Sequence, residues 1–188
     1  MGDRVIVVQL SPTDKETRDM LLKYLQETAD HAVKNEPGTL KYSLATSRDE
    51  SDLSLYVIEE YADQTAFDFH MQQDGVQAMG KWMSAGGLDS APTIWELEHI
   101  DGFNFTRPEV TRHADPFVIF TEIDYKPDTG SSTLPYWKAV VEAGENDELG
   151  TLVYGICRDP KNADKLFVVH AYESRDYLMD VHVPNCRE

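Results

Sequence analysis

Basic residues, cysteines and long apolar runs are all scarce in this sequence of 188 residues. Lysine and arginine together number 17 against 34 aspartates and glutamates, so the formal net charge is −17 at pH 7. A surface of that sign repels phosphate backbones and anionic lipids, and we therefore expect no nucleic acid and no membrane as a partner. No stretch approaches the ~20 consecutive apolar residues that a membrane-spanning helix needs.

Cysteine occurs only as Cys157 and Cys186, too few for a disulfide framework. No apolar signal segment precedes the first strand-like residues, and the simplest expectation is a reduced, cytoplasmic setting. The sequence also lacks a glycine-rich phosphate loop, a nucleotide fingerprint and the close ligand spacing of a zinc site. We expect neither a nucleotide cofactor nor a metal.

Apolar residues make up 41% of the sequence, enough for one large core or two small ones. In the first half, period-two alternation and helical spacing predict the element order β-α-β-β-α-β. The first predicted helix begins at Thr13 or Asp14, and the second, from Ala66, breaks near Gly75 or Gly86. This order is that of a ferredoxin-like fold. The predicted strands cover residues 5–10, 40–44, 53–61 and 93–100.

The second half repeats the first. Gly38-Thr39-Leu40-Lys41-Tyr42 matches Gly150-Thr151-Leu152-Val153-Tyr154 at an offset of 112, and the pair Tyr61 and His70 matches Tyr172 and His182. The pattern predicts α+β repeats at residues 1–106 and 117–188, joined by a proline-bounded linker at 107–116, with the second repeat lacking its last strand. Its predicted strands are 117–125, 152–157 and 166–172, and its predicted helices 134–143 and 175–183.

One group of motifs resembles a known family. The first repeat carries Asn35-Glu36-Pro37-Gly38-Thr39-Leu40-x-Tyr42, then Glu59-x-Tyr61 with His70 nine residues on. These motifs are similar to those of the antibiotic biosynthesis monooxygenase (ABM) family of the dimeric α/β barrel superfamily. The resemblance covers residues 4–105 better than 117–184, where Glu148-Leu149-Gly150 replaces Glu-Pro-Gly and His170 stands at the Glu59 position.

The resemblance implies a fold and an activity. The implied fold packs two ferredoxin-like sheets as a dimeric α/β-barrel-like pseudo-dimer within one chain, and the missing strand makes a homodimer a reasonable hypothesis. The implied activity is that of a cofactor-independent monooxygenase of secondary metabolism, with dioxygen and an aromatic polyketide such as an anthrone, quinol or phenol as substrates. A cyclase or isomerase of the same pathways, a non-catalytic ligand-binding barrel and, more distantly, haem degradation remain alternatives.

Such a reaction needs a base near neutral pKa, donors for a developing oxyanion and an apolar cavity. His70 is the candidate base, or else a buried core or helix-capping histidine. Glu59 either orients Tyr61 or, if its pKa is raised by burial, acts as a rival base. Tyr61 and Tyr42 are candidate donors to a phenolate, or core aromatics.

Four further residues are candidates for substrate binding, namely Phe67, Trp82, Trp95 and His99. The aromatic rings would wall a planar substrate by stacking, but packing explains them equally well. His99 alternates with Trp95 and Leu97 and is expected to share their face of the strand. Because only the first repeat is complete, we expect it to hold the working site and His182 to matter less than His70.

Overall fold

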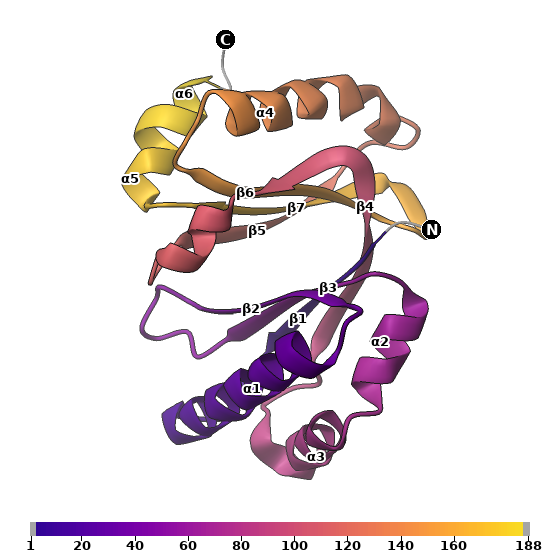
Figure 1. Cartoon of the computed structure of the whole chain (residues 1–188), viewed down its shortest axis with the longest axis vertical. Coiled ribbons are helices and arrows are strands. Elements are labelled where there is room, and N and C mark those ends of the chain that lie inside the picture. The colour runs from indigo at the N-terminus through magenta and orange to yellow at the C-terminus, as the bar shows by residue number, and fades with distance from the viewer. Residues whose placement is uncertain (1–2, 186–188) are drawn as a thin grey trace. The chain divides into compact units, whose positions relative to one another are not determined.

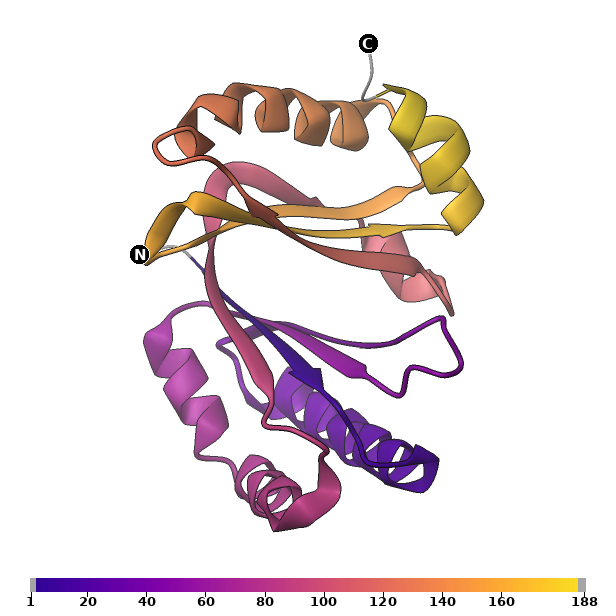
Figure 2. The same ribbon diagram turned by 180° about the vertical axis from the view of Figure 1, so that it is seen from behind.

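The computed structural model describes residues 3–185, and Figure 1 and Figure 2 show it from two sides. Internal contacts divide the chain into two units, Met1–Leu97 (unit 1) and Glu98–Glu188 (unit 2). Strand β4 (Thr93–Thr106) begins in unit 1 and ends in unit 2. Unit 1 contains residues 1–97 of the first predicted repeat and unit 2 contains the second, and each unit is described separately below.

Unit 1 has the ferredoxin-like order of elements. Its strands lie in the antiparallel order β2-β3-β1-β4, and α1, α2 and α3 cover one face of them (Figure 1). The break in the second predicted helix falls between α2 and α3, next to Gly75. The elements are β1 (Arg4–Leu10), α1 (Lys15–Asn35), β2 (Thr39–Thr46), β3 (Leu55–Tyr61), α2 (Gln64–Met71) and α3 (Asp74–Trp82), followed by the π-helical turn η1 (Met83–Gly87).

Two aspartates fix where the helices of unit 1 begin. The Asp14 carboxylate accepts a hydrogen bond from the Thr17 amide at 2.8 Å, and Asp63 accepts one from the Ala66 amide at 2.8 Å. Each bond satisfies an amide that the first helical turn leaves without a backbone partner. Helix α1 then buries Leu21 and Leu25 against the sheet residues Leu10, Leu55 and Val57.

Gly38 sets the distance between α2 and the turn that precedes β2. A Cβ atom added at Gly38 would lie 2.4 Å from the Cβ of Ala66, which is closer than real carbon atoms approach. The glycine of the repeated Gly-Thr-Leu-x-Tyr motif is therefore required by close packing, and it places the helix that carries His70. Gly150 has the same role in unit 2, because an added Cβ would lie 2.5 Å from the Tyr177 ring.

We therefore expect Gly38→Ala to destabilise unit 1 by about 1–3 kcal/mol, the usual cost of overpacking. The matched control is Gly80→Ala in α3, where an added Cβ meets nothing within 4 Å. Alanine is the better helix former, so this control should be neutral or more stable by up to about 1 kcal/mol. Urea denaturation followed by circular dichroism compares the two variants, and equal midpoints would contradict the packing argument.

Unit 2 repeats this arrangement without a fourth strand of its own. Its strands lie in the antiparallel order β4-β6-β7-β5, with the helices on one face (Figure 2). Among the described residues no strand follows β7, which confirms the predicted loss of the last strand. The elements are η2 (Pro108–Arg112), β5 (Phe117–Asp124), η3 (Gly130–Thr133), α4 (Leu134–Asn146), β6 (Thr151–Asp159), β7 (Asn162–Tyr172), α5 (Arg175–Tyr177), η4 (Leu178–His182) and α6 (Val183–Asn185).

Strand β4 is longer than the sequence predicts. The alternation expected over residues 93–100 is interrupted at Gly102, which adopts a φ of 75°, and the register with β6 shifts between His99 and Asn104. Pairing then resumes at Asn104, Phe105 and Thr106 opposite Gly155, Tyr154 and Val153. Because this bulge interrupts the alternation, the sequence pattern does not indicate that the strand continues.

The two repeats also share a backbone irregularity. Pairing shifts register between Thr39 and Lys41 in β2 and between Thr151 and Val153 in β6, at matching positions of the repeated motif. The α+β class and the tandem ferredoxin-like repeats are confirmed. The contact division falls at Leu97, inside β4, whereas the predicted linker at 107–116 marks where the sequence repeat restarts.

Candidate functional site

A buried glutamate and histidine form the centre of the candidate site in unit 1. Glu36 lies in the turn after α1, His70 lies in the last turn of α2, and both are at most 3% exposed. The Nδ1 atom of His70 is 2.9 Å from Oε2 of Glu36, and the Thr39 hydroxyl donates to the same oxygen at 3.1 Å. Because a carboxylate accepts hydrogen bonds, the proton of a neutral His70 lies on Nδ1 and its Nε2 is left as the basic atom.

A second carboxylate faces the basic nitrogen of His70. Oε1 of Glu59, on β3, lies 3.9 Å from Nε2 of His70. Glu59 is 7% exposed, and its burial raises the pKa of the carboxyl group above its usual value. The prediction that Glu59 has the raised pKa of a rival base is therefore consistent with its surroundings.

Two tyrosines complete the polar surroundings of His70. Tyr42 on β2 pairs directly with Glu59, and the ring centroids of Tyr42 and Tyr61 lie 5.9 and 5.4 Å from that of His70. Burial, together with the nearby Glu59 carboxylate, raises the pKa of both tyrosines far above the usual value. Their hydroxyls therefore keep their protons and are available as hydrogen-bond donors.

This arrangement can move a proton. When Nε2 of His70 accepts one, the resulting imidazolium lies between the carboxyl groups of Glu36 and Glu59. Glu36 holds the ring in one orientation, as a carboxylate does for histidine in other proton-transfer sites.

The remaining predicted residues lie in several places. Phe67 packs edge-on against Tyr61 with ring centroids 5.4 Å apart, and the Arg4 guanidinium lies 5.4 Å from the Phe67 ring, so Phe67 supports the cluster from the side. Trp82 packs on the hydrophobic cluster of unit 1 that also includes Tyr42, and its ring centroid is 6.0 Å from that of Tyr24.

Trp95 and His99 both lie on β4, on opposite sides of the division between the units. Trp95 is half-buried, whereas His99 is buried in unit 2, where its Nδ1 lies 3.5 Å from Sγ of Cys157. The structure thus groups His70, Glu59, Tyr61, Tyr42 and Phe67 and gives His99 a different neighbour. Cys186 lies outside the described residues.

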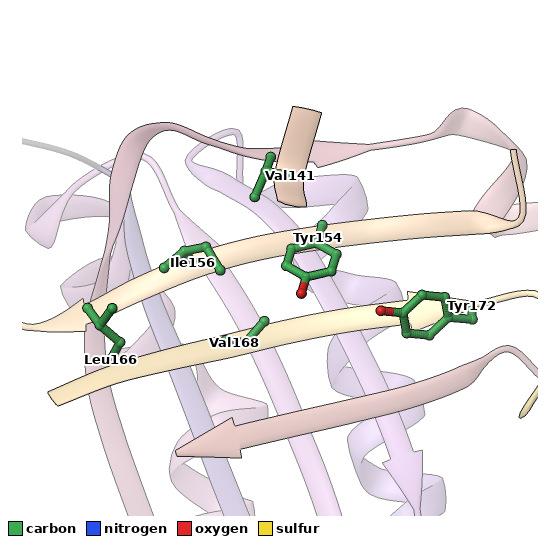
Figure 3. Close-up of a cluster of buried hydrophobic side chains, with 6 residues drawn as sticks. All are labelled: Val141, Tyr154, Ile156, Leu166, Val168 and Tyr172. Atoms are coloured by element: carbon green, nitrogen blue, oxygen red, sulfur yellow. The ribbon is translucent and has the colours of Figure 1, made fainter. Parts of the chain in front are cut away.

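Unit 2 contains a second copy of the glutamate–histidine pair. Oε2 of Glu148 lies 2.6 Å from Nδ1 of His182 and accepts from the Thr151 hydroxyl at 2.8 Å, while Oε1 accepts from the Asn185 amide at 3.1 Å. Burial alone would raise the pKa of Glu148, but these hydrogen bonds outweigh it and lower the pKa. The hydroxyls of Tyr154 and Tyr172 extend toward each other on the same face of β6 and β7 (Figure 3).

The two copies differ at one position, where His170 in unit 2 replaces Glu59. Burial, and then the positive charge of His182, lower the pKa of His170 to about 3. Nδ1 of His170 is hydrogen-bonded to the Tyr172 hydroxyl at 2.9 Å. Unit 2 therefore has one carboxylate with two imidazoles, whereas unit 1 has two carboxylates with one imidazole.

His170 gives a pH-dependence that can be measured. Its pKa falls from 6.5 to about 3 on folding, so between these values the unfolded chain binds more protons and stability is lost as the pH falls. The loss should reach at most about 1.4 kcal/mol per pH unit. We expect His170→Gln to reduce the decline of the urea midpoint between pH 6.5 and 4. The control His31→Gln, at an exposed histidine, should leave that decline unchanged. Parallel profiles for parent and His170→Gln would contradict the assignment.

Sequence reasoning missed Glu36 and Glu148 as members of the site. Glu36 was part of the motif that carried the family resemblance, but it received no chemical role. The available signal was that a glutamate stands two residues before the Gly-Thr-Leu-x-Tyr motif in both repeats. Thr39 and Thr151, inside the motif, bind the glutamate oxygen in each unit.

Two pockets of unit 1 lie on its helical side. A pocket of about 510 Å³ is lined by residues of α1 and of the α2–α3 junction, including Glu36, and a second lies along α3 and η1. Neither is lined by His70, Tyr42 or Trp82, so His70 is closed to solvent in this structure.

Two kinds of feature are absent from residues 3–185. No group of three or more histidine, cysteine or acidic side chains is close enough together to hold a metal ion. No helix in this range combines the length and the apolar character needed to cross a membrane.

Comparison with known proteins bears on the first repeat. Residues 4–82 match the family described as "Antibiotic biosynthesis monooxygenase", so unit 1 contains an ABM domain and the resemblance is confirmed there. No curated protein matches the chain significantly.

Two solved structures match nearly the whole chain. A proposed monooxygenase from Lactobacillus acidophilus NCFM is 13% identical with a TM-score of 0.80, and the match covers 97% of this chain and 82% of that one. A proposed monooxygenase from Fusobacterium nucleatum subsp. nucleatum ATCC 25586 is 18% identical with a TM-score of 0.79, covering 97% and 81%. At these identities the similarity establishes the tandem fold.

Proposed function

We propose that this chain, whose unit 1 contains an ABM domain, is a cofactor-independent monooxygenase acting on an aromatic polyketide such as an anthrone, a quinol or a phenol. The observation that carries the proposal is the buried Glu36–His70–Glu59 cluster with two protonated tyrosines beside it. Such a cluster supplies a base and hydrogen-bond donors at one place. In this proposal the substrate reaches the cluster on the helix-covered face of the unit 1 sheet, which carries Tyr42, Glu59 and Tyr61.

In the proposed reaction Nε2 of His70 removes a proton from the activated carbon of the substrate. The carbanion, delocalised over the aromatic rings as a phenolate or enolate, reduces dioxygen, and a carbon–oxygen bond forms. Loss of water then leaves a carbonyl group, so an anthrone CH₂ and O₂ give C=O and H₂O. The substrate supplies all the electrons, and no external reductant is needed. Tyr42 and Tyr61 donate to the developing oxyanion.

An oxygen electrode with 1,8-dihydroxyanthrone as the substrate tests this proposal. We expect enzyme-dependent oxygen uptake above the autoxidation rate, with one quinone formed per O₂ consumed. Conversion of an aromatic substrate under nitrogen would instead favour the cyclase or isomerase, which needs the same base but no oxygen. Binding without conversion would favour a ligand-binding barrel, an alternative supported by the closure of His70 from solvent.

The proposal also includes assembly and location. In the described part of the chain the sheet order of unit 2 ends at β5, and edge strands tend to pair with another chain, which supports a homodimer. Light scattering after size-exclusion chromatography should therefore give about twice the chain mass, and a clean monomer would contradict it. The thiol form of buried Cys157 supports a reducing, cytoplasmic setting.

A further inference from the structure

Strand β2 of unit 1 and strand β6 of unit 2 hold equivalent positions in the two repeats, but their outer edges differ. On that edge β6 is paired with the end of β4, where Asn104, Phe105 and Thr106 lie opposite residues 155, 154 and 153. In the described part of the chain β2 is paired with β3 alone and ends the sheet order. The outer edge of β2 therefore carries the backbone groups that its counterpart uses for pairing.

Side chains along this edge are exposed in unit 1 and covered in unit 2. Leu40 is 47% exposed, whereas Leu152, its counterpart at the offset of 112, is 1% exposed. Tyr42 is half-buried, whereas Tyr154 is 3% exposed. Beside this edge, in the last turn of α1, Val33 is 65% exposed. An apolar surface is thus left open in unit 1 at the position that is covered in unit 2.

The end of β4 shows what kind of side chain fits this position. Phe105 packs on the hydrophobic cluster of unit 2, and a Cβ atom added at Gly144 would lie 3.5 Å from its ring. Ala32 holds the position of Gly144 in unit 1. Because 3.5 Å is an ordinary van der Waals distance, the methyl group of Ala32 leaves room for an aromatic ring placed as Phe105 is.

Arg107 fixes the end of the same segment. Its backbone amide donates to the Leu152 carbonyl at 2.8 Å. Its guanidinium donates to the carbonyls of Thr151 at 2.9 Å, Gly144 at 3.0 Å and Glu145 at 2.6 Å. The last two carbonyls end α4, where the helix dipole favours a cation. The carbonyls at the same positions of unit 1 are those of Leu40, Thr39, Ala32 and Val33.

We propose that the outer edge of β2 binds an extended segment of a different protein, in which an aromatic residue is followed two positions later by an arginine. The segment pairs antiparallel with β2, its ring packs beside Ala32, and its arginine donates to the carbonyls at the end of α1. In such strand addition, main-chain hydrogen bonds give affinity and side chains give specificity.

Two features favour a different protein with a basic segment as the partner. The net charge of −17 attracts a segment that carries a cation. A second copy of this chain is not the expected donor, because its residues 104–106 are already paired with its own β6. The inference does not depend on the proposed oxygenase activity.

A synthetic peptide that copies residues 103–108, Phe-Asn-Phe-Thr-Arg-Pro, tests the proposal. Fluorescence anisotropy of the labelled peptide is measured as the full chain is added, and we expect saturable one-to-one binding. Replacing the peptide's arginine by glutamine should weaken binding at least about 10-fold, because a charged donor to several carbonyls is lost. Replacing its second phenylalanine by alanine should also weaken binding.

Substitutions in the chain locate the binding. Leu40→Lys places a like charge beside the peptide's arginine at an exposed position, so we expect at least about 10-fold weaker binding without loss of folding. The matched control is Met20→Lys, which adds the same charge at an exposed apolar residue of α1, about 18 Å along the helix from Ala32. This control should bind the peptide as the parent does.

Hydrogen exchange locates the binding independently. Saturating peptide should slow the exchange of the β2 amides and leave those of β5, at the other end of the sheet order, unchanged. Protection of β5 in place of β2, equal affinities for the arginine and glutamine peptides, or equal affinities of Leu40→Lys and Met20→Lys would overturn the proposal. Absence of binding would also overturn it, whether β2 stays open or a second copy of the chain occupies it.

Discussion

His70→Ala should lower kcat/KM for an anthrone by about 10²- to 10⁴-fold, the usual contribution of a positioned general base. In unit 1 the imidazolium that forms when His70 accepts a proton lies 2.9 Å from Glu36 and 3.9 Å from Glu59. In unit 2 Glu148 faces Nδ1 of His182, and His170 stands at the position that Glu59 has in unit 1. We therefore expect His182→Ala to lower kcat/KM less than 10-fold, an estimate for loss of a structural contact only.

The comparison needs a control for folding, because each alanine leaves a buried glutamate without its histidine. Circular dichroism and urea midpoints should show that both variants are folded at the assay temperature. His70→Gln keeps a donor for Glu36 but has no basic nitrogen, so it should be as inactive as His70→Ala while being more stable. Equal losses of activity for His70→Ala and His182→Ala, or no loss for either, would refute the assignment of catalysis to unit 1.

Glu59, whose place His170 takes in unit 2, allows an independent test of the assignment of catalysis to unit 1. Glu59→Gln keeps the shape of the side chain but removes the titrating group whose pKa burial raises. If Glu59 acts as a base, kcat should fall and the acidic side of its pH profile should shift, whereas a group that only orients Tyr61 would leave the profile in place. The result decides between the two roles that the sequence leaves open for this residue.

Much of the fold could be predicted from residues close together in the sequence. The Gly-Thr-Leu-x-Tyr motif, repeated at an offset of 112, identified the tandem repeat. The motif recurs because its glycine, bulge and tyrosine occupy equivalent packing positions in both units. The end of β4 could not be predicted, because Gly102 and the bulge after His99 interrupt the alternation on which strand prediction depends.

The site was harder to predict because its pairs join distant residues. Glu36 and His70 are 34 residues apart, as are Glu148 and His182, and only the fold brings each pair together. His70 could be singled out because histidine titrates near neutral pH. Nothing local to Glu36 distinguishes it from an exposed glutamate after a helix, and only its repetition in the second copy does so. Trp82 and His99 have side chains of the kind that suits a substrate site. Their periodic spacing alone could not show whether they bind a substrate or pack in the core.

Glu148→Ala should cause a large loss of stability, about 3–5 kcal/mol. The Glu148 side chain is 1% exposed and accepts hydrogen bonds from His182, Thr151 and Asn185. Its removal takes an acceptor away from the buried Thr151 and His182 side chains and from the exposed Asn185 amide, and it opens a cavity beneath the last helical turns. The matched control is Glu145→Ala, an exposed glutamate in the last turn of α4, which should change the free energy of unfolding by no more than about 0.5 kcal/mol.

The pH dependence distinguishes the charge of Glu148 from its shape. Its pKa is lowered on folding, so the ionised carboxylate stabilises unit 2 at neutral pH, and that stability is lost as the pH falls below the usual glutamate value through the folded one. Glu148→Gln keeps the volume and one acceptor oxygen but does not titrate. We therefore expect the difference between the free energies of unfolding of parent and Glu148→Gln to be largest at pH 7 and to shrink toward pH 3. Urea denaturation across that range measures it, and a difference that stays constant with pH would show that the carboxylate charge does not contribute.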